Sequence, residues 1–198
     1  MPKLYYQGHG SFRLQTDGGK IVYVDPYAGD GYELPAGMIL VTHQHDDHNQ
    51  VDLCAKEPNC IIITEAEALA GGKHNTFSYD EIEIKAVPAE NKNHNPAECV
   101  GFIITINGVK LYAAGDTSKT DAMAHMRAEN LDYTLLPCDG VYNMDLDEAA
   151  ECASLIGAKV NIPIHLKPGA LFDRDRANAY QAPNKRIVAA GEEIELRS

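Results

Sequence analysis

Residues 42–48, THQHDDH, restrict the possible fold of this chain more than any other stretch. Three histidines and two aspartates follow directly on the apolar run MILV at 38–41. A strand that ends at Thr42 would deliver these side chains into a loop at the edge of a sheet, where side chains can converge. Imidazole nitrogens and carboxylate oxygens are good ligands for zinc, iron, manganese and nickel. This loop alone cannot complete two metal sites, so further ligands must come from later strand ends.

The spacing within the loop predicts two groups of ligands. In an extended segment, residues two apart share a face, so His43 and His45 can bind one ion. Once the chain turns, Asp47 and His48 point elsewhere and can begin a second site. The alternative is a solvated polar loop. We disfavour it because three of the eight histidines in the chain fall within six residues.

Three later residues are candidates for the missing ligands, and each follows an apolar strand pattern. His94 lies in PAENKNHNP after EIEIKAVP, Asp116 lies in AAGDTS after KLYAA, and His165 lies in IPIHL after KVNIP. Taken singly, each is better explained as a cap or a hydrogen-bonded core residue. Together with the THQHDDH loop they predict a convergent metal centre.

The pattern of short apolar runs predicts two sheets packed face to face with helices outside them. The 198 residues show no linker or low-complexity tract, so one domain over 1–198 is expected. A hairpin is expected around Asn107-Gly108, within residues 99–116. The other expected strands lie within residues 4–15, 20–27, 38–42, 60–64, 81–88, 133–137, 159–165, 186–190 and 193–197. The expected helices are 51–57, 65–72, 119–130 and 145–158, with Asp145 or Asp147 as a cap of the last.

Composition narrows the class of partner. A net charge of −12 disfavours nucleic acid, whose binding depends on Lys and Arg, and favours a small-molecule substrate. The longest apolar runs are far below the roughly 18 residues of a membrane span. The amino terminus lacks the apolar segment of a secretory signal, so the cytoplasm is expected.

Five scattered cysteines without a CxxC pair indicate reduced thiols. A homo-oligomer is compatible with the sequence, but no hydrophobic stripe marks an interface.

The motifs, taken in order, resemble the metallo-β-lactamase superfamily, and within it the small-domain branch of L-ascorbate-6-phosphate lactonase-like hydrolases. The resemblance spans nearly the whole chain. It is carried by GHGSF at 8–12, VDPY at 24–27, THQHDDH at 42–48, PAENKNHNP at 88–96, AAGDT at 113–117, PCDGVYNMDLDEA at 137–149 and IPIH at 162–165. The fold that it implies is an αββα sandwich of two mixed β-sheets with helices on the outer faces.

The resemblance also implies a role for each candidate residue. Two divalent metal ions are expected, with zinc ahead of manganese, nickel or iron. A water or hydroxide between the ions would attack the substrate, so no serine or cysteine nucleophile is needed. Asp47 and Asp116 would be catalytic as well as ligands. The implied ligands are His43, His45 and His94 for one ion, Asp47, His48 and His165 for the other, and Asp116 for both.

Five other residues keep two interpretations each. His9 either faces the site or supports the loop, and Asp25 either holds a ligand imidazole or shapes the turn beside Pro26. Cys138 is either exposed to the site or a buried structural thiol. Tyr142 and Asn143 either lie over the substrate or belong to a helix cap.

Two functions follow from this sequence. The first is a metal-dependent hydrolase that acts on a lactone, a phosphoester or another small ester or amide. The alternative is an iron-dependent oxidoreductase that uses the same scaffold. The Cys138-Asp139 pair stands where many members of the branch carry an aliphatic residue and glycine, so contacts at this strand end are expected to differ.

Overall fold

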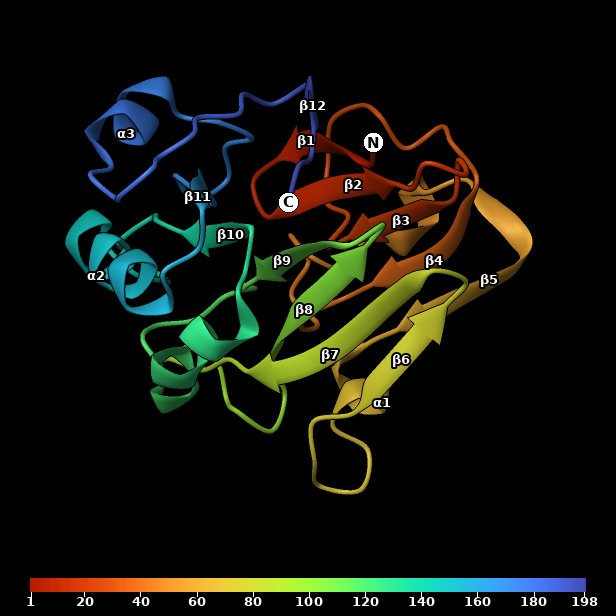
Figure 1. Ribbon diagram of the computed structural model, residues 1–198, viewed down its shortest axis with the longest axis horizontal. Helices are drawn as coiled ribbons and strands as arrows, with labels where there is room; N and C mark the ends of the chain where they lie inside the picture. Colours follow the sequence, from red (N-terminus) through yellow and green to blue (C-terminus); the bar gives the residue numbers. More distant parts are fainter.

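The structure is a computed structural model that describes residues 1–198, and two six-stranded β-sheets dominate it (Figure 1). The strands of the first sheet, in spatial order, are β12 (Glu192–Glu195), β1 (Lys3–Gly8), β2 (Ser11–Gln15), β3 (Ile21–Val24), β4 (Ala36–Leu40) and β5 (Lys56–Ile63). Those of the second are β11 (Val160–Ile164), β10 (Tyr133–Pro137), β9 (Val109–Ala113), β8 (Val100–Ile106), β7 (Ile82–Pro88) and β6 (Thr76–Tyr79).

Both sheets are mixed. In the first, β3, β4 and β5 are parallel neighbours, whereas β12, β1, β2 and β3 pair antiparallel. In the second, β9, β10 and β11 are parallel and β6 to β9 are antiparallel. Because β12 pairs with β1, the two ends of the chain lie side by side (Figure 1).

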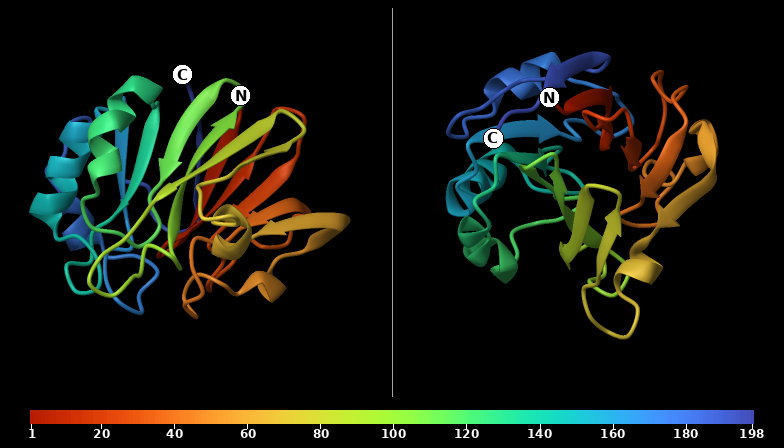
Figure 2. Two further views of the ribbon diagram at one scale, coloured as in Figure 1. Left: turned by 90° about the horizontal axis from the view of Figure 1, so that it is seen from below. Right: turned by 45° about the vertical axis from the view of Figure 1, so that its right-hand side comes forward.

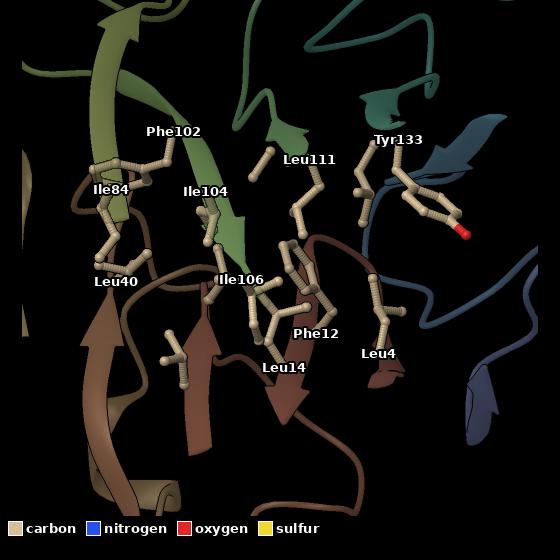
Figure 3. Packing of buried hydrophobic residues seen from close by; sticks show 14 of the residues in the cluster. Leu4, Phe12, Leu14, Leu40, Ile84, Phe102, Ile104, Ile106, Leu111 and Tyr133 are labelled. Atoms are coloured by element: carbon tan, nitrogen blue, oxygen red, sulfur yellow. The ribbon is translucent and has the colours of Figure 1, made fainter. Parts of the chain in front are cut away.

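The main hydrophobic core lies between the two sheets. It contains 27 buried residues, contributed by alternate positions of the strands, as a pleated strand with one face inward requires. Figure 3 shows Phe12 and Leu14 of the first sheet facing Ile104, Ile106 and Leu111 of the second. This packing fixes the two sheets against each other and therefore fixes the relative positions of their edges.

Different elements cover the two outer faces. A second core of 18 buried residues lies between the second sheet and the helices α2 (Leu146–Ile156), α3 (Arg174–Ala179) and the 3₁₀ helix η2 (Asp121–Glu129). Figure 2 shows these helices on one side of the sandwich. The outer face of the first sheet is covered by a loop that carries Tyr32 and by the single-turn η1 (Val51–Leu53). The expected αββα sandwich is confirmed, with few helices.

Several expected elements differ from those observed. The helix expected at 51–57 is reduced to the 3₁₀ helix η1 (Val51–Leu53), because β5 already begins at Lys56 and includes Pro58. Proline is tolerated there because β5 is an edge strand and its register shifts between Lys56 and Ile61. The strand expected at 186–190 is absent, and only an isolated bridge joins Lys185 to Asn161. Val188 is nonetheless buried in the main core.

Other elements agree with the sequence or were missed. The Asn107-Gly108 turn joins β8 and β9, and both residues have positive φ, as this type of hairpin requires. Asp145 caps α2, since its side chain accepts the backbone N–H of Glu148. Residues 119–130 form η2, a 3₁₀ helix rather than an α-helix. Helix α1 (Glu65–Ala68) is shorter than expected, and β6 was not expected. No helix has the length and apolar character needed to cross a bilayer.

We expect Ile104→Ala to reduce the free energy of unfolding by about 2–5 kcal/mol, because it leaves a cavity between the sheets. Ile104 has no exposed surface, whereas Ile61 on β5 is 44% exposed. Ile61→Ala is the matched control and should cost less than about 1 kcal/mol. Urea unfolding followed by circular dichroism measures both values. Equal losses would contradict the assignment of the core.

Candidate metal centre

Polar side chains follow the carboxyl ends of strands in both sheets. Strands β1, β3 and β4 share one direction in the first sheet, and β7, β9, β10 and β11 share one direction in the second. Because the sheets are packed face to face, these ends meet at one edge of the sandwich. The polar residues beyond them are His9, Asp25, the 43–48 loop, Asn91, His94, Asp116, Asp139 and His165.

The first group of candidate ligands is His43, His45 and His94. Their ring nitrogens lie within 4.8 Å of one another. Nε2 of His94 is 3.2 Å from Nδ1 of His45. Two of these residues come from the loop after β4 and the third from the segment after β7, so both sheets contribute.

The second group contains Asp47, His48 and His165, and a fourth residue, His9, lies with them within 4.8 Å. The carboxylate of Asp47 lies 3.9 Å from Nε2 of His48 and 3.8 Å from Nε2 of His165. The segment after β11 thus reaches the loop after β4, which is more than a hundred residues away in the sequence.

Asp116 lies between the two groups. Its carboxylate is 3.4 Å from Nε2 of His94 in the first group. It is 3.3 Å from Nε2 of His48 and 3.5 Å from Nε2 of His165 in the second. All seven residues expected from the sequence are therefore brought together, with the aspartate in contact distance of both histidine sets.

Most of these groups are buried, and several of their polar atoms have no hydrogen-bond partner. His45 is exposed and the Asp47 side chain is 36% exposed, while the others are buried. A buried polar atom without a partner costs about 1–3 kcal/mol. Two cations, one bound in each group, would satisfy these atoms. The unpartnered ligand atoms are Nε2 of His43, His48 and His165 and Oδ1 of Asp116.

Asp25 holds the imidazoles of the THQHDDH loop. Its carboxylate accepts hydrogen bonds from the Thr42 backbone N–H (2.7 Å) and hydroxyl (2.8 Å), and lies 3.0 Å from Nδ1 of His48. The Thr42 hydroxyl in turn lies 3.0 Å from Nδ1 of His43. Both rings therefore point Nε2 into the centre. Carboxylates commonly orient metal-binding imidazoles through the other ring nitrogen in this way.

Asn91 and Asp139 make the same kind of contact, and sequence reasoning missed both as supports. Oδ1 of Asn91 lies 2.8 Å from Nδ1 of His94, and Oδ2 of Asp139 lies 2.9 Å from Nδ1 of His165. Asp139 also accepts the backbone N–H groups of Val141 and Tyr142. Their position in the sequence could have identified them, because Asn91 and Asp139 each lie two or three residues beyond a strand end.

The charges of the centre act on one another. Burial alone would lower the pKa of His165, but the carboxylates of Asp116, Asp139 and Asp47 outweigh burial and raise it to about 9. Burial likewise opposes the shift at His48, whose pKa Asp116 and Asp25 raise. Burial, helped by the neighbouring histidines, lowers the pKa of His43 to about 2. The carboxylates thus favour positive charge inside the centre.

The same interactions act in reverse on the acids. Burial would raise the pKa of Asp116, but His48 and His165 hold it well below its usual range. At Asp47 burial is again outweighed, here by His165 and His9, and the pKa falls. Both carboxylates are therefore ionised at neutral pH and available as ligands.

The backbone is strained at three points of the centre. His9, Asp25 and His165 have φ values of 57°, 47° and 45°, in the left-handed region that residues other than glycine seldom adopt. Such strain is concentrated at functional sites. Each of the three residues directly follows a strand, so the left-handed turn redirects its side chain toward the centre.

A pocket of about 370 Å³ opens onto the two groups. Tyr142 lies in its wall and is exposed. The amide of Asn143 donates to Asp139 rather than capping α2. Cys138 is fully buried, which agrees with its structural interpretation. The pocket is lined by His45, Asp47, Asn93, His94, Asp116 and Tyr142.

Known proteins are similar to this chain in sequence and in fold. Residues 3–165 match the family described as beta-lactamase superfamily domain. A UPF0173 metal-dependent hydrolase of Ligilactobacillus salivarius is 32% identical, over 82% of this chain and 84% of that protein. Another, from Pelotomaculum thermopropionicum, is 27% identical over 98% of this chain and 100% of that protein.

Solved structures agree. The crystal structure of a Parabacteroides distasonis protein has a TM-score of 0.77 at 28% identity and covers 93% of this chain and 91% of that one. Igni18, a metallo hydrolase from Ignicoccus hospitalis, has a TM-score of 0.74 at 21% identity, with 99% of each chain covered, and supports the fold alone. The resemblance to the ascorbate-6-phosphate lactonase-like branch stays a prediction. The chain belongs to the metallo-β-lactamase superfamily and, within it, to the UPF0173 family of metal-dependent hydrolases.

Proposed function

We propose that this chain hydrolyses a small ester-type substrate, such as a lactone or a phosphoester, at a centre of two divalent metal ions. The observation that carries the proposal is the set of buried ligand atoms without hydrogen-bond partners around Asp116. Bound cations would satisfy these atoms, each of which is costly to bury without a partner.

The donor set fits divalent transition metals. His43, His45 and His94 would hold one ion, and Asp47, His48 and His165 would hold the other. Asp116, which lies 3.3 to 3.5 Å from ring nitrogens of both groups, would contribute to both. Imidazole with carboxylate suits zinc, manganese, iron and nickel, and we place zinc first.

Divalent ions, when bound, supply Lewis acidity toward a substrate oxygen and make water nucleophilic at neutral pH. The chain supplies the remaining chemistry. Asp47 lines the pocket next to the second group and is partly exposed, whereas Asp116 is buried. Asp47 can therefore orient the attacking water and accept a proton at its carboxylate. The charge of Asp116 offsets the positive charge of the centre.

The cysteines near the site do not offer a competing nucleophile. Cys99 lines a pocket beside the first group and Cys138 follows β10, but both are buried. Burial raises the pKa of both thiols, so neither forms a thiolate at neutral pH. We therefore favour a mechanism in which activated water attacks the substrate over one in which a cysteine of this chain forms a covalent intermediate.

The pocket indicates a small substrate. A volume of about 370 Å³ lies at the lower end of the range for small-molecule sites, which is about 300–1,000 Å³. The exposed phenol of Tyr142 stands on its wall, close to the amide of Asn93, which donates to the Tyr142 carbonyl. An ester with an apolar part that stacks on Tyr142 would fit this arrangement.

His45→Ala should lower the metal content of purified protein from two ions per chain to one, because it removes an exposed ligand of the first group. Asp116→Ala should lower it further, since Asp116 touches both groups. Elemental mass spectrometry measures the content, and hydrolysis of γ-lactones and bis(p-nitrophenyl) phosphate should fall at least a hundredfold in both variants.

His74→Ala serves as the control for this experiment, since His74 is exposed and lies outside the centre. Full metal occupancy with normal turnover in His45→Ala or Asp116→Ala would refute the proposed centre. Iron as the sole metal of the wild type would favour the oxidoreductase alternative instead.

Asp139→Asn should weaken metal binding about 10–100-fold, as is typical when the residue that orients a ligand imidazole is changed. The amide keeps an oxygen for the N–H groups of Val141 and Tyr142 but loses the charge facing Nδ1 of His165. Titration calorimetry of chelator-stripped protein with Zn²⁺ gives the affinities. Asp145→Asn is the matched control, because asparagine caps a helix as well as aspartate does. Equal affinities in the two variants would contradict the role of Asp139.

Gly10→Ala should weaken binding of the second ion without removing any ligand. A Cβ at position 10 would lie 2.7 Å from Cε1 of His48, whose buried ring cannot move away without leaving Asp25. Gly18→Ala is the control, since a Cβ there meets only ordinary contacts. The same calorimetric titration measures both variants, and an unchanged affinity in Gly10→Ala would show that His48 is not a ligand.

A further inference from the structure

We infer that His9 is an additional ligand of the second ion, beside Asp47, His48 and His165. This inference rests on the proposed metal centre and extends it, because His9 lies outside the ligand set that the sequence resemblance implies. The observations that carry it are the position of His9, the partners of its two ring nitrogens and its distance from the other ligands.

The backbone of His9 is tied to the ligand His165. The backbone N–H of His165 donates to the carbonyl of His9 at 2.8 Å, and the phenol of Tyr6 donates to the same carbonyl at 2.7 Å. The N–H of His9 donates to the carbonyl of Leu171 at 2.7 Å. These bonds hold His9 in its left-handed conformation, and its ring packs against the ring of His165 with 3.7 Å between centroids.

The two ring nitrogens of His9 have different partners. Nδ1 lies 3.1 Å from the carbonyl oxygen of Ala170, which can only accept a hydrogen bond, so Nδ1 carries a proton. In the neutral ring, Nε2 then has a free lone pair. A ring nitrogen that donates to a backbone carbonyl while the other is free is the usual state of a metal-binding histidine.

The free nitrogen points at the second group. Nε2 of His9 is 3.0 Å from Oδ2 of Asp47 and lies within 4.8 Å of the ligand atoms of His48 and His165. At this distance a positive charge must lie between the two atoms, either a proton on Nε2 or a metal ion bound to both. Water cannot take its place, because His9 has no exposed surface. The position of Nε2 among the other ligand atoms favours the metal ion.

The alternative is a proton shared between Nε2 of His9 and Asp47. His9 would then carry charge and would only orient the carboxylate, without touching an ion. The two arrangements differ in one observable, namely what is bound to Nε2: a metal ion in the first and a hydrogen atom in the second.

A ligand at position 9 makes the two sites unequal. The first ion would have three histidines and Asp116, which matches the four ligands of tetrahedral zinc. The second would have His9 in addition to Asp47, His48, His165 and Asp116. Five protein ligands exceed a tetrahedral set and suit a metal of higher coordination number, such as manganese, iron or cobalt. The second site should therefore discriminate less in favour of zinc than the first.

The first experiment uses chelator-stripped wild type, His9→Gln, His9→Asn and the control His74→Gln, each titrated with Co²⁺. Wild type and control should bind two ions per chain. Both His9 variants should bind the second ion at least tenfold more weakly, and its visible absorption should grow stronger as the coordination number falls. Asparagine at position 9 is included because it tolerates the left-handed backbone.

The second experiment needs no variant and decides the matter if the His9 variants do not fold. A long-range ¹H–¹⁵N NMR spectrum of the zinc-loaded wild type, labelled at histidine, reports the state of each ring nitrogen. A metal-bound Nε2 at His9 supports the inference. A protonated Nε2, or His9 variants that bind two cobalt ions with wild-type affinity and spectrum, would overturn it. A wild type that binds no metal would instead refute the proposed function itself.

Discussion

Asp116 is the buried charge on which the arrangement of the centre depends. A carboxylate in the interior is stable only if positive charge and hydrogen-bond donors surround it. Asp116 obtains such surroundings because it follows β9, in the middle of the second sheet, where the histidines of both sheets can reach it. Gly115 lets the backbone before Asp116 pack closely against both sheets. Its φ is 63°, and a Cβ there would lie 2.9 Å from Cβ of Thr42 and 2.9 Å from the carbonyl oxygen of Val100.

The histidines around Asp116 are held by a set of supports that also come from strand ends. Asp25, Asn91 and Asp139 each face the Nδ1 of one histidine, so each ring presents Nε2 to the centre. The strained backbone and the unpartnered atoms of this region cost stability, which the main core of 27 residues offsets. The rigid sandwich thus permits an edge that would be unstable on its own, and metal binding would relieve the remaining cost.

The sequence predicts the candidate ligands better than the residues that orient them. THQHDDH follows a buried strand so closely that its position at a sheet edge could be predicted, and His94, Asp116 and His165 share the same signal. Asn91 and Asp139 carry it too, but an isolated polar residue after a strand is more often a cap. Two predictions from local pattern were also wrong: Pro58 lies in a strand rather than ending a helix, and residues 186–190 do not form a strand. Both segments lie at a sheet edge, where tertiary packing decides which residues pair. Which strand ends meet is a tertiary property that no local pattern contains.

The two halves of the proposed centre differ in their access to solvent, and this difference indicates how they divide the work. The first group includes His45, which is exposed, whereas His9, His48 and His165 of the second group are each at most 1% exposed. Asp47 and Asp116 are the residues that connect the second group to the pocket, and of the two only Asp47 is partly exposed. An ion in the second site would exchange slowly and fix Asp47, while an ion in the first would meet the substrate directly. In the proposed reaction, the substrate bond would therefore lie next to Asp47 and His45, which line the same pocket.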